Sequence, residues 1–466
     1  MSHKFRLPVL GVLFTTIIFL LGLSVFFTND DFFFLKISLV NSPVDIINFF
    51  NPTKGPEGFG VYRPLTTQAY YAVSRNLFHS SPVVLRSLSF AGLLSISFLV
   101  YRLSQRLTGS AKAAGISVFI YLISVTHYAH LFYSASFQEI GFTFFSLLGC
   151  LALWRKPYYS VLCFFLALLS KETAITYPLL IPLLYYFNSD VRSKVGNLKQ
   201  LFSLVGIHFI VLAVYAYFRF YFYGFATGDS YIWEFSPKII NTVGWYLLWS
   251  FNLPEMWVDF IGPGLHVNPN LFKFWGRETV LIFSLFLIFL LPLLVAFKKS
   301  KLRLTIFSGF WFLITLGPLL FLPWHKFSFY LTLPLVVISI LVGELLANHK
   351  YKNLLLITWV LLTVSSFLLT HKTNWISRGA EVSRRVHEYL VSREASQIPW
   401  QQIVFYDSPA DSVLPWAPSA VVKVALSDNN YFQVFWPELS AVYLSEKPAK
   451  ISFGQILVPA RQFLGY

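Results

Sequence analysis

Long apolar runs separated by short polar segments recur along most of the 466-residue chain. Runs of about 17 to 25 apolar residues match the length that an α-helix needs to cross a bilayer. Two of the runs, 157–170 and 173–188, are short and are separated only by Lys171-Glu172, so we expect a re-entrant or broken pair there. In all, the pattern predicts about eleven spans, near 7–27, 82–101, 113–129, 134–153, 157–170, 173–188, 201–222, 279–297, 304–322, 328–347 and 353–370.

The composition indicates an all-α polytopic membrane protein. Hydrophobic residues make up 56% of the chain and charged residues 12%, which is more apolar surface than a soluble protein of this length could bury. A net charge of +15 could suit a nucleic-acid partner if the basic residues formed one stripe. They gather instead in short loops between alternate spans, so we predict that the bilayer is the partner and that nucleic acid is not.

These basic loops also predict the orientation, because Lys and Arg are enriched on the cytoplasmic side of membrane proteins. The N-terminus is then cytoplasmic, and the first span reads as an uncleaved anchor, since no small-residue cleavage pattern follows it. We expect a cell-membrane protein, of the inner membrane in a bacterium. The loop residues are Lys4, Arg6, Arg102, Arg106, Lys112, Arg155, Lys156, Arg192, Lys194, Lys199, Lys298, Lys299, Lys301, Arg303, Lys350 and Lys352.

The chain divides into a multi-pass membrane domain, 1–370, and a small extracytoplasmic α/β domain, 371–466. Two long outer loops, 28–81 and 223–278, interrupt the membrane domain. The second half of the first loop predicts an amphipathic helix on the membrane surface, with apolar positions at Leu65, Ala69, Val73 and Leu77.

The second loop is rich in Trp and Tyr, which suits either an interfacial aromatic belt or a lining for substrate. These aromatic residues include Tyr231, Trp233, Trp245, Tyr246, Trp249, Trp257 and Trp275. In the tail we expect a helix near 374–395, then a strand at QQIVFYD and further strands at SAVVKVAL and YFQVFW.

Asp30 and Asp31 directly follow the first span. A carboxylate pair where a membrane helix meets water is costly to desolvate and adds nothing to packing. Either the pair marks a helix end or it performs catalysis. We favour catalysis because other charged residues lie at the same expected face.

Lys171 and Glu172 lie between two apolar runs, where an isolated charge must find a partner, a cavity or a charged ligand. Neighbouring residues of a helix point about 100° apart, so these two side chains need separate partners. Arg63 precedes Pro64, which disfavours helix at Arg63 and favours a helix start after it. Together Arg63 and Lys171 would suit a lipid-linked phosphate, whereas either one alone could be an interfacial residue.

The order of several motifs resembles the membrane core of glycosyltransferases of the C superfamily (GT-C). After the Asp-Asp pair come YRPLTT at 62–67, THYAHLFYSASFQEIGF at 126–142, LSKETAIT at 169–176 and WHKFSFYLTLP at 324–334. Within the superfamily, the chain looks most like the protein O-mannosyltransferases that carry tetratricopeptide repeats, and their bacterial relatives. The resemblance covers roughly residues 7 to 370. The tail departs from it by having no helical repeats, which leaves the acceptor in doubt.

The resemblance implies an inverting transfer of a sugar, such as a mannosyl or other hexosyl group, from a polyprenyl-phosphate donor at the outer face. The acceptor would be a protein hydroxyl, a lipid or a glycan. Asp30 or Asp31 would deprotonate the acceptor, and Arg63 and Lys171 would bind the donor phosphate, with His325 and Lys326 as further ligands. Supporting residues would be Glu139, Glu172, His127, His130, Tyr62 and Tyr330.

We predict no cofactor. His127 and His130 have an i, i+3 spacing that could suit a metal, but no third ligand is evident. Cys150 and Cys163 both fall inside expected spans and predict no disulfide. The competing functions are a transporter or flippase for a lipid-linked sugar, an enzyme like the O-antigen ligases or polymerases, and a membrane scaffold for the tail.

Overall fold

The computed structural model describes residues 6–54, 60–224, 228, 231–262, 264, 266–297, 302–394, 401–414, 416–450 and 452–465. Of the basic loop residues named above, Lys4, Lys298, Lys299 and Lys301 lie outside this part of the chain.

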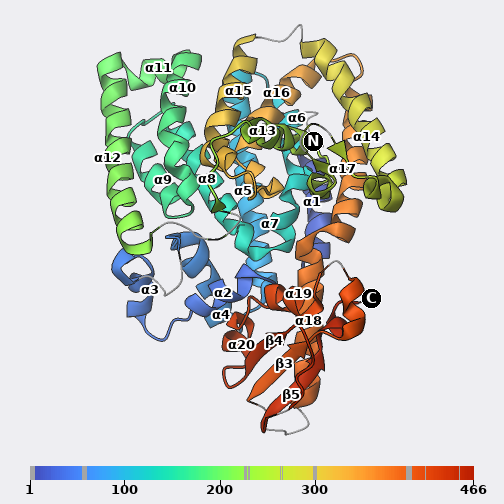
Figure 1. Cartoon of the computed structure of the whole chain (residues 1–466). Coiled ribbons are helices and arrows are strands. Elements are labelled where there is room, and N and C mark those ends of the chain that lie inside the picture. Colours follow the sequence, from blue (N-terminus) through green and yellow to red (C-terminus); the bar gives the residue numbers. More distant parts are fainter. Residues whose placement is uncertain are drawn as a thin grey trace.

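Helices dominate the described chain (Figure 1). The first half contains α1 (Arg6–Gly22), α2 (Asp30–Ile37), α3 (Pro43–Phe49), α4 (Tyr70–Leu77), α5 (Pro82–Thr108), α6 (Ala111–Leu122), α7 (Tyr128–Phe132), α8 (Phe137–Ala152), α9 (Tyr159–Leu168), α10 (Leu180–Phe187), α11 (Ser189–Val195) and α12 (Leu198–Tyr223). The second half contains α13 (Lys238–Ser250), α14 (Asn270–Phe297), α15 (Leu302–Leu316), α16 (Pro334–Ala347), α17 (Lys352–Thr373), α18 (Trp375–Glu394), α19 (Pro418–Ala425) and α20 (Asn430–Phe435).

Six stretches of the described chain are helical, long and apolar enough to cross a membrane, and α6 with the segment 125–132 forms a further pair bent by 49°. The protein is therefore all-α and polytopic in its membrane part, as the apolar runs predict. Helices α1, α9 and α16 are apolar but only 10–17 residues long, so helix length does not confirm the expected count of spans. The six stretches are Pro82–Thr108, Ser134–Ala152, Leu198–Tyr223, Asn270–Val295, Leu302–Phe321 and Lys352–Thr373.

The break expected at Lys171 is confirmed. Helix α9 ends at Leu168, Lys171 is extended (φ −163°, ψ 140°), and a 3₁₀ segment, η5 (Glu172–Leu179), leads into α10. A helix end leaves carbonyl groups without partners in the helix. Here Leu65 N–H donates to the Leu169 carbonyl (3.2 Å) and the Thr66 hydroxyl to the Ser170 carbonyl (2.6 Å). The first outer loop therefore docks on the broken span.

The expected helix in this outer loop is present as a π-helical turn, η2 (Leu65–Ala69), followed by α4. Its buried side chains are mostly polar or aromatic, including Thr66, Thr67, Tyr70 and Tyr71, while Leu77, the last residue of α4, is 69% exposed. Of the predicted apolar positions, Leu65, Ala69 and Val73 are partly buried. The helix thus packs on the protein along most of its length, and its contact with a membrane surface stays a prediction.

Three tryptophans of the second outer loop are buried, unlike the residues of an interfacial aromatic belt. Trp245, Trp249 and Trp257 are each no more than 4% exposed, so the expectation of an interfacial position is wrong for them. They pack inside the protein because α13 and the 3₁₀ segment η7 (Glu255–Asp259) fold inward. Trp233 remains 51% exposed. A short antiparallel pair, β1 (Ile261–Gly262) and β2 (His266–Val267), closes the loop.

The tail contains a three-stranded parallel sheet in the order β4-β3-β5, together with helices α18, α19 and α20. Its strands are β3 (Gln402–Tyr406), β4 (Ser440–Leu444) and β5 (Gln455–Pro459), with Val404 opposite Val442 and Leu457. The helix near 374–395 and the strand at QQIVFYD are confirmed as α18 and β3.

The other two tail predictions are wrong, because SAVVKVAL forms most of α19 and YFQVFW most of α20. Local β-propensity is overridden by a cap from a distant residue. Pro418 stands at the helix start, where proline is tolerated. The Asp407 carboxylate accepts hydrogen bonds from the Ser419 N–H (2.6 Å) and hydroxyl (2.8 Å). The buried positions Ser419, Val422 and Ala425 then follow a helical period.

Helices α2, α3 and α4 and the tail sheet lie at the same end of the molecule, and α11, which carries Arg192 and Lys194, lies at the other end (Figure 1). The tail is attached to the start of α2. Asn29 N–H donates to the Ala425 carbonyl (2.9 Å), and the Phe32 ring meets the Tyr431 ring edge-on at 5.2 Å between centroids.

Helix α18 packs so closely against Thr28, beside this attachment, that position 379 of the helix requires glycine. A Cβ on Gly379 would lie 2.6 Å from Thr28 Oγ1, an atom of a fully buried side chain. We expect Gly379→Ala to cost about 1–3 kcal/mol through overpacking, more than the gain in helix propensity of about 1 kcal/mol. Thermal unfolding in detergent would measure it. Gly309→Ala in α15, where a Cβ meets nothing within 4 Å, is the matched control. Equal melting temperatures for the two variants would contradict this packing.

Candidate active site

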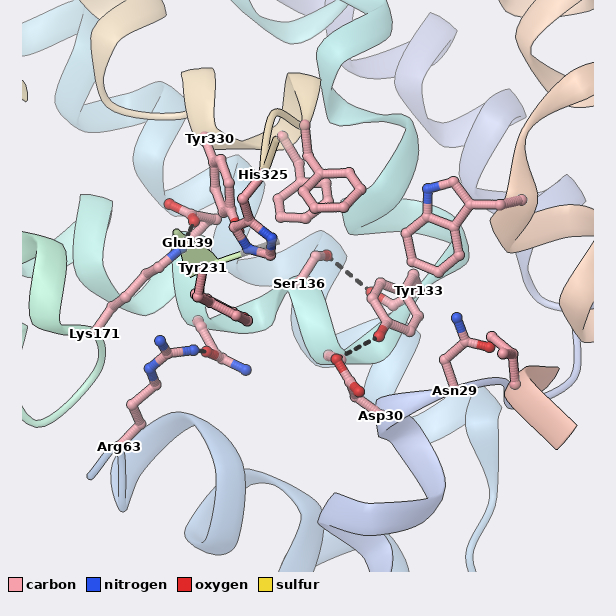
Figure 2. A pocket seen from close by; sticks show the side chains of 16 residues that line it. Asn29, Asp30, Arg63, Tyr133, Ser136, Glu139, Lys171, Tyr231, His325 and Tyr330 are labelled. Carbon is pink, nitrogen blue, oxygen red and sulfur yellow. Dashed lines mark hydrogen bonds and ion pairs between the residues drawn. The ribbon is translucent and has the colours of Figure 1, made fainter. Parts of the chain in front are cut away.

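A cavity of about 410 Å³ lies where the first outer loop, the broken span, the segment before α16 and the tail meet. It is drawn in Figure 2, with Arg63 and Lys171 on one side and Asp30 and Asn29 on the other. His325, Tyr231 and Tyr330 lie between them in this view. Asp30, Arg63, Lys171, Glu139, His325 and Tyr330, all expected from the sequence, line this one cavity.

The basic side of the cavity is built on two ion pairs. Lys171 Nζ bonds the Glu139 carboxylate, and both side chains are almost fully buried. The Arg63 Nε–Glu172 Oε2 distance is 2.5 Å. Lys171 and Glu172 thus have separate partners, as their adjacency requires.

Further contacts orient these cations. Arg63 Nη1 donates to the Gln138 amide oxygen, and Lys171 Nζ lies 4.1 Å from the centre of the Tyr330 ring. On its other oxygen, Glu172 binds Arg219 of α12 at 3.3 Å. Three cations face two carboxylates, so the cluster is net positive and suits an anion.

Pro64 places Arg63 here. The helical turn begins after Pro64, and the Arg63 carbonyl accepts the N–H groups of Thr66 (3.2 Å) and Thr67 (3.1 Å). The Arg63 side chain lies beside the break at Lys171 because the same turn is hydrogen-bonded to the end of α9. Two segments more than a hundred residues apart in the sequence therefore form one charged surface.

Asp30 is the first residue of α2, and its carboxylate opens on the cavity. Its hydrogen bond comes from the Tyr133 hydroxyl at 3.1 Å. The preceding residue, Asn29, has φ 50° and ψ −126°, a conformation that costs a non-glycine residue about 1–3 kcal/mol. This strained residue turns the chain just before the carboxylate, and the bond from Asn29 N–H to the tail maintains it.

Asp31 has a different environment and is fully buried. It accepts hydrogen bonds from the Tyr71 hydroxyl (2.5 Å) and from the N–H groups of Ala135 (2.9 Å) and Thr28 (3.3 Å). Burial raises its pKa to about 6, although the charge of Arg86 and these donors act to lower it. Asp31 joins α2 to α4 and to the segment before α8, and it does not line the cavity.

Asp30 is exposed to the cavity, but the protein atoms packed around the cavity partly desolvate its carboxylate and raise its pKa above the ordinary 3.8, while Tyr133 and the charge of Arg63 act in the opposite direction. A base must be ionised to accept a proton, so kcat/KM for any reaction that uses Asp30 as a base should fall about tenfold per pH unit below this raised pKa. A pH–rate profile would measure it. An acid limb at or below 3.8 would contradict the raised pKa, and the absence of any acid limb in Asp30→Asn, beside one in the wild-type protein, would assign the limb to Asp30.

His325 and Tyr330 come from the segment between α15 and α16. The Tyr330 hydroxyl and His325 Nε2 are 2.7 Å apart, and the His325 and Tyr231 rings lie 4.3 Å apart between centroids. Burial, together with the charges of Lys171 and Arg63, lowers the His325 pKa to about 4. At neutral pH this imidazole can hydrogen-bond a phosphate but brings it no positive charge.

The remaining expected residues lie outside the cavity lining. Lys326 Nζ donates to Asn241 Oδ1 (3.2 Å), and the Tyr62 hydroxyl donates to the Phe50 carbonyl (2.7 Å). His130 bonds Ser136 and Thr332, whereas the ring nitrogens of buried His127 have no hydrogen-bond partner in the described chain. Within that part of the chain, no group of three or more His, Cys, Asp or Glu residues could hold a metal ion.

Sequence reasoning missed several residues of the site. Arg219 was hidden inside the run 201–222, although a lone arginine in an apolar span is a signal that could have exposed it. Arg86 is likewise a buried arginine within a span, and its charge acts on Asp31. Gln138 and Tyr133 lie in the quoted motif at 126–142, but no spacing distinguishes them there.

No protein-family model matches this sequence, and no curated protein matches it. Among solved structures, it is similar to ArnT from Cupriavidus metallidurans bound to undecaprenyl phosphate, with a TM-score of 0.49 and 12% identity over 93% of this chain and 89% of that one. It is also similar to an Archaeoglobus fulgidus oligosaccharyltransferase tethered with an acceptor peptide containing the NVT sequon (TM-score 0.42, 11% identity, 91% of this chain, 63% of that one).

At these identities and TM-scores, neither likeness bears on the resemblance to GT-C membrane enzymes or on the closer likeness to O-mannosyltransferases with tetratricopeptide repeats. The likeness concerns the overall arrangement of the chain.

Proposed function

We propose that this protein is an inverting glycosyltransferase that moves a sugar from a polyprenyl-phosphate donor to a hydroxyl acceptor at the outer face of the membrane. One observation carries the proposal: a single cavity has the Asp30 carboxylate on one side and the Arg63 and Lys171 cations on the other. A base and an anion site on opposite sides of one space are what an in-line displacement at the anomeric carbon requires.

In the proposed reaction, the acceptor O–H bond breaks and its proton passes to Asp30. The acceptor oxygen forms a bond with the anomeric carbon as the bond from that carbon to the phosphate oxygen breaks. Polyprenyl phosphate leaves with the bonding electron pair, and Arg63 and Lys171 stabilise its charge. Attack from the face opposite the phosphate inverts the anomeric configuration.

The choice between the two aspartates follows from their contacts. Asp31 holds three donors in a fully buried network, which suits a structural role, whereas Asp30 opens on the cavity. The identity of the donor as a polyprenyl phosphate is supported by the resemblance of YRPLTT and LSKETAIT to the GT-C motifs, and by the position of the cavity beside apolar helices that would border lipid.

The test is transfer from radiolabelled polyprenyl-phosphate sugars, mannose among them, to a membrane extract by the purified protein. Label that enters a product other than the donor or free sugar supports the proposal. A lipid-linked sugar that crosses liposome membranes without any transfer would favour a transporter. In that case the cations would serve substrate binding alone.

A further inference from the structure

The tail completes the Asp30 side of the cavity. Trp375, the first residue of α18, and Val424 of α19 both line it beside Asn29 and Asp30. Any acceptor that reaches Asp30 therefore meets a surface made partly by the tail. This contribution is separate from the cation cluster, whose residues come from the membrane part of the chain.

The tail is fixed at this position by several kinds of contact. The Ala425 carbonyl accepts from Asn29 N–H (2.9 Å) and from the Ser383 hydroxyl of α18 (3.0 Å). The lack of space at Gly379 shows that α18 lies directly against Thr28. Trp375 and Val424 are thus held by the same attachment that holds the strained residue before Asp30.

The part of the cavity lining around Trp375 is aromatic. Its indole meets the Tyr133 ring at 5.2 Å between centroids and the Phe327 ring at 6.0 Å, in both cases edge to face, and Phe327 stacks on Phe329 at 5.2 Å. All four rings line the cavity. Ring contacts of this kind hold an indole in one orientation and leave it rigid.

Polar groups stand beside these rings. Asn29 and Ser136 line the same part of the cavity as Asp30. Thr28 Oγ1 lies 3.1 Å from the Asn29 amide oxygen, whereas the Asn29 amide nitrogen has no hydrogen bond within the described chain. An amide donor therefore lies next to the carboxylate proposed as the base.

Rigid rings beside a few polar groups suit a pyranose, which presents a face of C–H groups and a rim of hydroxyls. Such pockets take up a small ligand by burying apolar surface and orient it with a few hydrogen bonds. Peptides are mostly recognised through main-chain hydrogen bonds along a strand edge or through helix anchors in a groove, and proline-rich peptides lie along extended aromatic-lined grooves. The side chains around Asp30 match the first kind of ligand.

We infer that the acceptor is a carbohydrate and that Trp375 binds its sugar ring, with the accepted hydroxyl toward Asp30. The inference rests on the proposed function, since it names the acceptor of that reaction. Trp375 determines which acceptor is bound and takes no part in the bond-making step.

The first experiment compares Trp375→Ala, Trp375→Phe and Trp416→Ala in transfer of radiolabelled sugar from the polyprenyl-phosphate donor to membrane extract. Trp416 is a tail tryptophan that is 74% exposed and does not line the cavity, so it is the matched control. We expect Trp375→Ala to raise the half-saturating concentration of extract about tenfold, with donor half-saturation changed less than about twofold. Trp375→Phe, which keeps a ring, should recover part of the loss.

The second experiment identifies the labelled product. A protease-resistant product that gives a labelled disaccharide on partial acid hydrolysis supports a carbohydrate acceptor. Label that protease converts to small peptides, or label on a lipid that carries no other sugar, overturns it. Equal half-saturation for Trp375→Ala and Trp416→Ala overturns the role of Trp375. If the wild-type protein transfers no label at all, the proposed function fails and this inference fails with it. Transfer of label to protein would contradict the carbohydrate acceptor but would leave the proposed glycosyltransferase function standing.

Discussion

Replacing Asp30 with asparagine is expected to lower the rate of sugar transfer by about 10²- to 10⁴-fold, the usual contribution of a positioned general base. Asparagine has nearly the same shape and can still accept the Tyr133 hydrogen bond, so α2 and the cavity should remain intact. The loss should appear in kcat, with donor half-saturation nearly unchanged, because Asp30 lies on the side of the cavity away from Arg63 and Lys171. Steady-state transfer with the radiolabelled donor measures both quantities.

Two further variants make this result specific. Asp190→Asn, an exposed change in α11 at the opposite end of the molecule, should leave transfer unchanged. Asp31→Asn should lower thermal stability, because an amide cannot accept from all the donors that the buried carboxylate accepts. A stable Asp31→Asn protein without activity, beside an active Asp30→Asn protein, would reverse the assignment of the base.

Lys171→Met is expected to have the second large effect, since it removes one partner of a buried ion pair. Loss of a single partner leaves an uncompensated charge at Glu139, and such losses cost about 3–5 kcal/mol. The variant should melt at a lower temperature than the wild-type protein and should fail to transfer sugar. Circular dichroism during heating in detergent and the transfer assay report these two effects.

The double variant Lys171→Met with Glu139→Gln separates stability from function. Because it removes both charges, it should recover much of the lost thermal stability. Transfer should stay low if Lys171 acts on the donor phosphate. Recovery of transfer together with stability would show that the pair is only structural.

Local signals predicted a large share of this molecule. Apolar run length predicted an all-α, polytopic membrane part, although the expected number of spans stays unconfirmed. The lone charges at Lys171 and Glu172 predicted both the break and the need for separate partners. Pro64 predicted that Arg63 would stand before a helical turn. Each of these inferences depends only on a residue and its near neighbours in the sequence, so no tertiary information was needed.

Other features depend on partners that are far away in the sequence. Asp31 differs from Asp30 because distant residues such as Tyr71 and Ala135 approach it, and nothing in the sequence around the pair distinguishes the two. The helix at Ser419 forms because Asp407 caps it, which β-propensity alone could not indicate. Arg219 joins the site only once α12 lies beside the broken span.

The position of the tail also affects the order in which the molecule becomes complete during synthesis. Val424 and Ala425 leave the ribosome after α17, which is the last candidate span of the described chain, so these spans can insert while the tail part of the cavity lining beside Asp30 is still missing. Premature termination or proteolysis just after α17 would then leave an inserted protein with its cation cluster formed and its acceptor surface absent. In the proposed function, such a chain would retain a lipid-linked sugar without delivering it, so docking of the tail onto α2 would be the step that completes the acceptor side of the site.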